Sequence, residues 1–288
     1  MKIRLVAILA FVLTSSPAAA WWEYGHETTA AIAFAKVKPA TRAAINRLLR
    51  QSEMLDTPAC PARTLEEASV WADCIKQPAL RDRFSYAFSW HYQNADVCKP
   101  FDLTDACKDG HCVSAQITRN AKLLADRTVP LRERVMALAF LTHFIGDLHM
   151  PLHAGDRSDR GGNDVKAAYG IFAGPRTNLH SVWDGYLAER AISTPPALVT
   201  EATPAMAAGT VTDWSRESWQ VAKDAAYGVA LGDPCGAVPA RVELDNARIS
   251  ALVPIVRLQI ARGGMRLARL LDEALRDAPS SKPASRQR

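Results

Sequence analysis

The chain lacks an apolar run long enough to cross a bilayer, which needs about 20 residues. Residues 5–13 are continuously apolar but form a shorter run, between the basic residues Lys2 and Arg4 and the small residues 18–20. This order is typical of a secretory signal peptide. The sequence therefore predicts that residues 1–20 are removed on export to the periplasm or the medium, which makes Trp21 the first residue and leaves no membrane anchor. A retained N-terminal anchor is the alternative.

A charge excess is also missing from the body of the chain. Five of the 35 basic residues lie in residues 1–20 and 278–288, where there are no acids, so residues 21–277 carry 30 basic and 30 acidic residues. This balance excludes the broad basic field of a protein that grips nucleic acid through many phosphates, so any affinity for phosphate must arise locally. The basic tail, residues 278–288, is expected to be disordered.

No C-x2-C pair occurs, so the spacing of a zinc ribbon is absent. An even number of cysteines in an exported chain indicates disulfides. The six are Cys60, Cys74, Cys98, Cys107, Cys112 and Cys235. Close spacing favours the pair Cys107–Cys112, but spacing alone leaves the connectivity open.

Internal repeats and an interdomain linker are absent too, and 48% of the 288 residues are hydrophobic, which is ample for a buried core. Apolar residues recur at steps of three and four, and the last stretch contains Pro254 and Gly263-Gly264, where we expect a kink and a looser turn. The predicted helical ranges are 27–51 (broken near Pro39), 64–76, 114–126, 130–148, 179–191, 213–227 and 242–276. Residues 164–173 carry a modest strand signal, which predicts a small β-hairpin. The expected fold is mainly α, a single-domain helical bundle over residues 21–277.

Imidazole and carboxylate groups recur at helical spacing. His143 and Asp147 are four residues apart, as are His180 and Asp184, so each pair projects from one helix face. Further candidate ligands are His26, Asp73, His91 and His153. This set suits zinc and similar divalent ions. One such pair is more often a surface ion pair, and His143 has the apolar neighbours of a buried neutral histidine, but the joint occurrence favours a metal site.

The run from His143 to His153, HFIGDLHMPLH, resembles the core motif of the zinc-dependent single-strand-specific nucleases of fungi, plants and bacteria. These secreted enzymes have 3′-nucleotidase activity and are related in fold to the zinc phospholipases C. Other matching pieces follow in the family's order: Trp21 with Gly25-His26, Trp71-Ala72-Asp73, His91-Tyr92, Gly161-Gly162-Asn163, and Asn178-Leu179-His180 with Asp184-Gly185-Tyr186. The resemblance spans most of the chain and implies a helical fold with three zinc ions at the base of a cleft.

Carried over position by position, the resemblance implies three ligand sets. The first is Asp73, His91, His143 and Asp147; the second is the α-amine and carbonyl of Trp21 with His26 and a shared Asp147; the third is His153, His180 and Asp184. One carboxylate can bridge two ions about 3.5–4 Å apart, and an α-amine of pKa about 8 can bind metal near neutral pH. Because that amine exists only after processing, we expect the precursor to be inactive. His149 could chelate together with His153, but we expect it to line the cleft or support a ligand.

The implied reaction is hydrolysis of single-stranded DNA and RNA to 5′-phosphorylated products, and of 3′-mononucleotides, by water activated between paired zinc ions. Asp73 and Asp147 serve this reaction, Lys76 matches a lysine near the scissile phosphate, and Asn163 matches a phosphate- or base-contacting residue. A solvated lysine and a turn residue are the alternatives. Tyr92 and Tyr186 could stack a splayed base or simply pack in the core. Asn94 stands where fungal members have an acidic substrate contact. No protein partner is implied, and we expect a monomer.

The resemblance also implies the disulfides Cys98–Cys235 and Cys107–Cys112, with Cys60–Cys74 as an addition. Two other functions compete. A zinc phospholipase C would typically offer Glu where Asp184 stands and would need an apolar membrane-facing loop. A non-catalytic exported zinc-binding protein would usually carry His-rich, low-complexity loops, whereas these histidines are dispersed.

Overall fold

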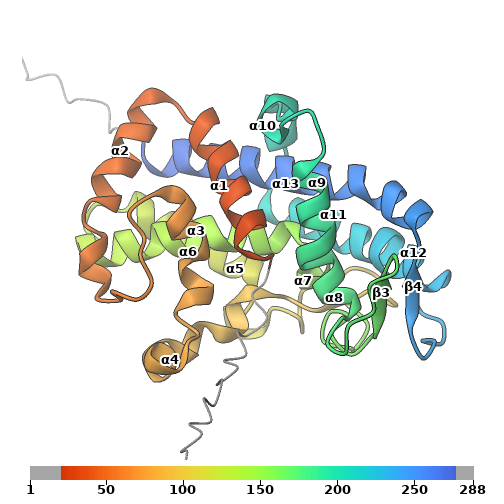
Figure 1. Cartoon of the computed structure of the whole chain (residues 1–288). Coiled ribbons are helices and arrows are strands. Elements are labelled where there is room, and N and C mark those ends of the chain that lie inside the picture. Colours follow the sequence, from red (N-terminus) through yellow and green to blue (C-terminus); the bar gives the residue numbers. More distant parts are fainter. Residues whose placement is uncertain (1–20, 277–288) are drawn as a thin grey trace, which may run out of the picture.

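The structure, a computed structural model, describes residues 21–276 (Figure 1). The signal peptide predicted at residues 1–20 and the disordered tail predicted at residues 278–288 lie outside the described residues and stay predictions. Among the described residues, no helix combines the length and apolar character needed to cross a membrane.

Five helices build the body, as the sequence predicts: α1 (Glu23–Lys36), α3 (Leu65–Cys74), α5 (Val113–Ala125), α6 (Leu131–His149) and α13 (Asn246–Ala274). Helix α6 is buried almost continuously from Val135 to His149, because α1, α3, α5 and α13 all pack against it. Figure 1 shows α6 and α13 crossing the molecule side by side. The mainly helical fold class is confirmed, and the polar residues of α6 enter the interior of the molecule.

The remaining helical elements connect and cover this body. They are α2 (Pro39–Leu49), η1 (Ser52–Leu55), α4 (Pro78–Phe84), η2 (Ser85–His91), η3 (Lys108–Gly110), α7 (Pro151–Ala154), α8 (Leu179–Ser181), η4 (Val182–Leu187), α9 (Ala188–Ser193), α10 (Leu198–Glu201), η5 (Pro204–Ala207), α11 (Val211–Val221), η6 (Ala222–Tyr227) and α12 (Gly228–Leu231). Two of them, η4 and η6, are π-helical turns inserted between α-helical segments.

Helix α13 runs unbroken through the positions where a kink and a loose turn were expected. Pro254 lies on its exposed side, where water can satisfy the carbonyl that loses its intrahelical partner. At Gly264 a Cβ would lie 2.4 Å from Cγ2 of Ile32 on α1. This glycine therefore allows two helices to pack closely, and the expectation of a looser turn is wrong.

The strands form two short parallel pairs. β1 (Ala95–Asp96) pairs with β2 (Gly155–Asp156), and β3 (Ala167–Tyr169) pairs with β4 (Val242–Leu244). A strand is thus confirmed within 164–173, and the chain folds back on it antiparallel through single bridges, Tyr169 with Phe172 and Lys166 with Asn178, in place of a regular two-stranded hairpin. The partner strand comes from much later in the chain, which a local pattern does not reveal. The β1–β2 pair has a direct consequence for function, since it brings the segment after His91 beside the segment after His153.

The six cysteines pair as Cys60–Cys74, Cys98–Cys235 and Cys107–Cys112. These are the pairs that the sequence and the resemblance indicated. Cys98–Cys235 ties the loop after β1 to the loop before β4, and so links distant parts of the chain.

Candidate metal centre

Eight histidine and aspartate side chains converge from elements far apart in sequence. His143 and Asp147 lie on α6, His153 on α7, and His91 at the end of η2. The others are His26 on α1, Asp73 on α3, His180 on α8 and Asp184 in η4. Their nitrogen and oxygen atoms form three groups able to hold an ion, each group within 4.8 Å: His26, Asp73 and His143; His91, His143 and Asp147; His153, His180 and Asp184.

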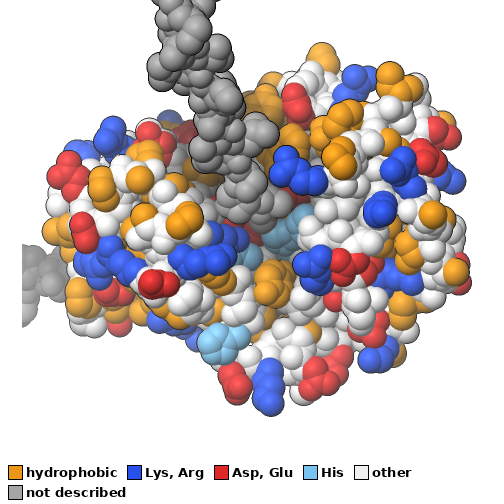
Figure 2. Space-filling view, turned by 60° about the horizontal axis from the view of Figure 1, so that its bottom comes forward, with side chains coloured by type: hydrophobic (Ala, Val, Ile, Leu, Met, Phe, Trp, Pro, Cys, Tyr) orange, Lys and Arg blue, Asp and Glu red, His pale blue; other side chains and the backbone are white. Residues whose placement is uncertain are grey.

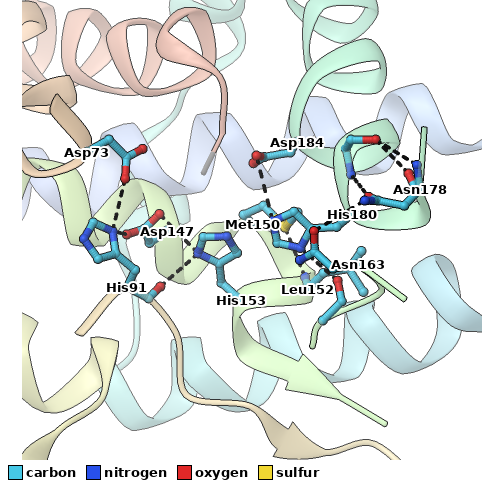
Figure 3. Close-up of polar contacts among 12 residues, drawn as sticks. Asp73, His91, Asp147, Met150, Leu152, His153, Asn163, Asn178, His180 and Asp184 are labelled. Atoms are coloured by element: carbon cyan, nitrogen blue, oxygen red, sulfur yellow. Dashed lines mark hydrogen bonds and ion pairs between the residues drawn. The ribbon is translucent and has the colours of Figure 1, made fainter. Parts of the chain in front are cut away.

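The Asp147 carboxylate, which is fully buried, lies at the centre of this arrangement (Figure 3). Its Oδ2 is 2.9 Å from Nδ1 of His91 and 3.0 Å from Nε2 of His143. Its Oδ1 is 3.2 Å from Nδ1 of His153 and 3.6 Å from Nε2 of His26. Oδ2 thus faces the imidazoles of His91 and His143 and Oδ1 faces that of His26, as expected of a carboxylate shared between two ions.

Asp73 completes the group on the α3 side. Its Oδ1 lies 3.5 Å from Nδ1 of His91 and 3.7 Å from Nε2 of His143. The same oxygen accepts a hydrogen bond of 2.6 Å from Nζ of Lys76, one helical turn later. Lys76 is therefore held at the centre by an ion pair.

The third group lies beside the first two. Nε2 of His180 is 3.9 Å from Oδ2 of Asp184, and the His180 ring stacks on that of His153 with centroids 5.1 Å apart. Figure 3 shows His180 and Asp184 on one side of His153, with Asp147, His91 and Asp73 on the other.

Backbone carbonyls fix the orientation of three rings. Nδ1 of His143 donates to the Ser69 carbonyl at 2.6 Å, and Nδ1 of His153 donates to the His91 carbonyl at 2.9 Å. Nδ1 of His180 donates to the Gly161 carbonyl at 2.8 Å. A proton held on Nδ1 leaves the lone pair of Nε2 free to bind a metal ion, as in metal-bound histidines.

Several buried polar atoms in the centre have no hydrogen-bond partner. They are both ring nitrogens of His26, Nε2 of His91, Oδ1 of Asp147 and Oδ1 of Asp184. Unpaired buried groups of this kind are costly unless something binds them. The donor set of nitrogens and oxygens without thiolate fits zinc or a similar divalent ion.

Burial sets the protonation states. It lowers the pKa of His26 and of His180 to about 3 and that of His91 to about 4, so these rings are neutral at neutral pH. Burial alone would raise the pKa of Asp147, but His143, His153 and His91 lower it well below its ordinary value. Burial raises the pKa of Asp184 well above its ordinary value, assisted by the charges of Asp73 and Asp147. A divalent cation would reverse this last effect, because it stabilises the carboxylate.

A cleft of about 290 Å³ opens onto the centre, and Figure 2 shows histidines within a hollow surrounded by Lys and Arg side chains. Its lining consists of Lys76, His91, Tyr92, Asn94, Leu152, His153, Arg160, Asn163 and His180. Three of the clustered histidines thus share this lining with two cations and two amides.

The start of the described chain enters this centre. Trp21 is buried, and its backbone nitrogen hydrogen-bonds the Asp184 carboxylate. The next nitrogen, that of Trp22, donates to the Asp184 carbonyl at 3.1 Å. A Cβ at Gly25 would lie 2.5 Å from Cε3 of Trp21, so this glycine allows the first turn of α1 to close over the indole.

Comparison with known proteins accounts for this geometry. A family model described as S1/P1 nuclease matches residues 21–276. The chain belongs to the S1/P1 nuclease family. It is similar to Endonuclease 2 of Arabidopsis thaliana (27% identity; 94% of this chain and 97% of the relative) and to Endonuclease 4 of the same plant (29%; 96% and 95%). It is also similar to Nuclease P1 of Penicillium citrinum (26%; 88% and 97%). The enzyme is therefore a nuclease, a hydrolase of phosphoester bonds.

Three of the four substrate-contact residues expected from the sequence lie along the cleft of the nuclease: Tyr92, Asn94 and Asn163. The fourth, Tyr186, is not among the residues that line this cleft. Its ring lies 5.2 Å from that of Trp22, 5.5 Å from Tyr169 and 5.4 Å from Phe172, which makes a partly exposed aromatic group. Any contact of Tyr186 with substrate would therefore occur outside this cleft.

His149 is not among the residues that line the cleft, so the first of its two expected roles is wrong, and support of a ligand stays a prediction. Its Nδ1 donates to the Ile145 carbonyl at 2.7 Å, and its Nε2 accepts from Nη1 of Arg266 at 2.8 Å. Burial and the charge of Arg266 lower its pKa to about 3. Both ring nitrogens are thus occupied on the α13 side of α6, which leaves neither free to chelate with His153.

Sequence reasoning missed Arg160, which shares the cleft wall with Lys76. Its Nε lies 3.1 and 3.2 Å from the two carboxylate oxygens of Asp164, four residues later. The signal was present in the sequence, because Arg160 immediately precedes the Gly161-Gly162-Asn163 motif.

Proposed function

We propose that this nuclease is an exported, zinc-dependent phosphodiesterase. It hydrolyses single-stranded DNA and RNA to 5′-phosphorylated products and removes phosphate from 3′-mononucleotides. The observation that carries the proposal is the position of Asp147, whose two oxygens face different imidazoles beneath a cleft lined by cations.

Three zinc ions account for the donor atoms. Asp73, His91, His143 and Asp147 would hold one ion; Asp147, His26 and the processed terminus of Trp21 would hold a second; His153, His180 and Asp184 would hold the third. The unpaired atoms of His26, His91, Asp147 and Asp184 support this assignment, since each is buried and open to a ligand. Bound zinc would lower the pKa of a bound water, so that hydroxide is available to attack at neutral pH, and would neutralise charge on the phosphate.

The residues of the chain have separate tasks in this scheme. Lys76, 2.6 Å from Asp73 at the cleft wall, would place a positive charge near the scissile phosphate. Asp73 would hold both Lys76 and the attacking water in register, and Arg160 and Asn163 would bind the phosphate or base on the opposite loop. Local cations explain how a body without net charge attracts a polyanion.

Strand selectivity follows from the shape of the site. Tyr92 is 41% exposed at the cleft and could stack on a base that is turned out of its strand. A duplex keeps its bases stacked inside, so presenting one to Tyr92 would require unpairing. Asn94 lies beside Tyr92, where its amide could contact the base edge.

Export to an oxidising compartment fits the three disulfides, and removal of residues 1–20 fits the position of Trp21 beside Asp184. Removal of residues 1–20 would convert the Trp21 nitrogen, already beside Asp184, into an amine able to bind metal. The proposal includes a monomer that is exported to the periplasm or the medium.

The test is a digest of single- and double-stranded DNA, RNA, 3′-AMP and phosphatidylcholine by the processed protein. Each substrate is assayed before chelation, after chelation and after zinc is restored. We expect zinc-dependent cleavage of the single strands and of 3′-AMP, with 5′-phosphate on the products. Hydrolysis of phosphatidylcholine alone would replace the proposal with a phospholipase, and zinc uptake without any hydrolysis would replace it with a zinc-binding protein.

A further inference from the structure

The loop between β2 and β3 is held by two aspartates that belong to none of the ligand sets. Oδ1 of Asp156 accepts from the backbone nitrogens of Asp159 and Gly161, at 3.1 and 2.8 Å. Oδ1 of Asp159 accepts from the backbone nitrogen of Gly162 at 2.8 Å. The two carboxylates thereby fix the peptide units on both sides of Gly161.

The peptide unit after Gly161 and the next one along the chain in turn hold His180. The Gly161 carbonyl accepts the 2.8 Å hydrogen bond from Nδ1 of His180, and the Gly162 carbonyl accepts from the His180 backbone nitrogen at 3.3 Å. Gly161 has a φ of +62°, and a Cβ there would lie 2.3 Å from the Leu152 carbonyl oxygen, so the chain can pass here only as glycine. The loop therefore orients both the ring and the backbone of a proposed zinc ligand.

A tyrosine from a distant element fixes the loop. The hydroxyl of Tyr227, which is fully buried, donates to Oδ1 of Asp159 at 2.6 Å. Burial and the charge of Asp159 raise the pKa of Tyr227, so its hydroxyl stays protonated and keeps donating. The guanidinium of Arg157 covers the tyrosine ring, 5.9 Å from its centroid.

Tyr227 reaches Asp159 from the last residue of the π-helical turn η6. Such turns are rare and change the direction in which the following side chains project. The other π-helical turn, η4, carries Asp184, the proposed ligand that faces His180. The turn η4 therefore carries Asp184 itself, and the turn η6 acts on His180 through Tyr227 and the loop.

We infer that Tyr227 and Asp159 are positioning residues for the site formed by His153, His180 and Asp184. The tyrosine hydroxyl holds Asp159, Asp159 holds the peptide unit between Gly161 and Gly162, and the carbonyl of that unit orients His180 so that its Nε2 faces Asp184. The inference rests on the proposed function, because it assigns a zinc ion to that site.

The test compares Tyr227→Phe, Asp159→Ala and Asp159→Asn in the processed protein. Zinc bound per chain is measured during titration with a competing chelator, and the melting temperature is measured with and without zinc. We expect Tyr227→Phe and Asp159→Ala to lower the affinity for the ion at the site of His153, His180 and Asp184 about 10- to 100-fold. This is the usual effect of removing a residue that orients a metal ligand. Asp159→Asn should restore most of this affinity, since its amide oxygen can accept from both Tyr227 and Gly162.

A purely structural role gives a different result. In that case the variants would lower the melting temperatures of the metal-free and zinc-loaded proteins equally, and zinc affinity would be unchanged. Asn120→Ala is the control, because it removes a buried 2.8 Å hydrogen bond within α5 that has no link to the loop. Equal zinc affinity in wild type, Tyr227→Phe and Asp159→Ala would overturn the inference.

His180→Ala separates the two possible failures. If it loses an ion while Tyr227→Phe does not, the zinc site stands and the positioning role is refuted. If neither variant changes zinc binding, the site itself is absent, and the three-ion proposal fails together with the inference.

Discussion

Gly146→Ala is predicted to disable the metal centre while leaving the helix intact. Gly146 lies on α6 directly before Asp147, facing α1. A Cβ there would lie 2.5 Å from Nδ1 of His26 and 2.8 Å from its Cε1. Because non-bonded heavy atoms approach to about 3.5 Å, the imidazole would have to move by about 1 Å. His26 has little room, since its ring stacks on His143 with centroids 4.0 Å apart.

The expected magnitude follows from this displacement. Misplacing a catalytic group by about 1 Å can cost about 100-fold in rate, and metal ligands tolerate only about 0.2 Å. We therefore expect kcat on single-stranded DNA to fall about 100-fold and bound zinc to fall from the three proposed ions to two. Overpacking costs about 1–3 kcal/mol, and replacing a helical glycine by alanine returns about 1 kcal/mol, so the protein should still fold.

The assay combines zinc content, kcat on single-stranded DNA, and circular dichroism. Gly263→Ala is the matched control, because it also adds a methyl group to a buried helical glycine, but its nearest neighbour is Cγ2 of Thr29 at 3.2 Å. The control should keep its zinc and its activity. Retention of three ions and wild-type kcat by Gly146→Ala would refute the placement of His26 against α6.

Three further predictions concern other parts of the molecule. A protein with residues left before Trp21 should bind less zinc than the processed enzyme and show no nuclease activity; full activity of the extended form would contradict the role of the terminal amine. Lys76→Met should lower kcat/KM about 10- to 100-fold, the worth of a hydrogen bond to a charged group, with zinc content unchanged; loss of zinc would instead make Lys76 a support for Asp73. The pKa of His149 is about 3 in the folded protein and about 6.5 when unfolded. When the pH is lowered from 8 to 5, the free energy of unfolding of the metal-free protein should therefore fall by about 2 kcal/mol more than that of the His149→Gln variant. The free energy of unfolding falls as the pH is lowered because only the unfolded state takes up the proton. If urea unfolding gives the same loss of stability for the two proteins between pH 8 and pH 5, this account is excluded.

Local periodicity determined much of the helical body. The spacing of His143 and Asp147 requires only that residues 130–148 form a helix, and α6 is that helix. The same applies to His180 and Asp184, although the π-helical turn η4 between them has no signature in the apolar pattern. An even number of cysteines in a chain with a predicted export signal similarly pointed to disulfides.

The tertiary structure alone decided which of these residues meet. His149 has the same four-residue spacing to His153 as His143 has to Asp147, yet its ring faces Arg266, which lies 117 residues further along the chain. Strand β3 is apparent from its sequence, but its partner β4 is not. Asp73 and His91 reach Asp147 only because α3 and η2 pack on α6. The apolar pattern recurs at steps of three and four residues and so defines the buried face of each helix. The choice of partner for each face depends on burial of the whole chain at once.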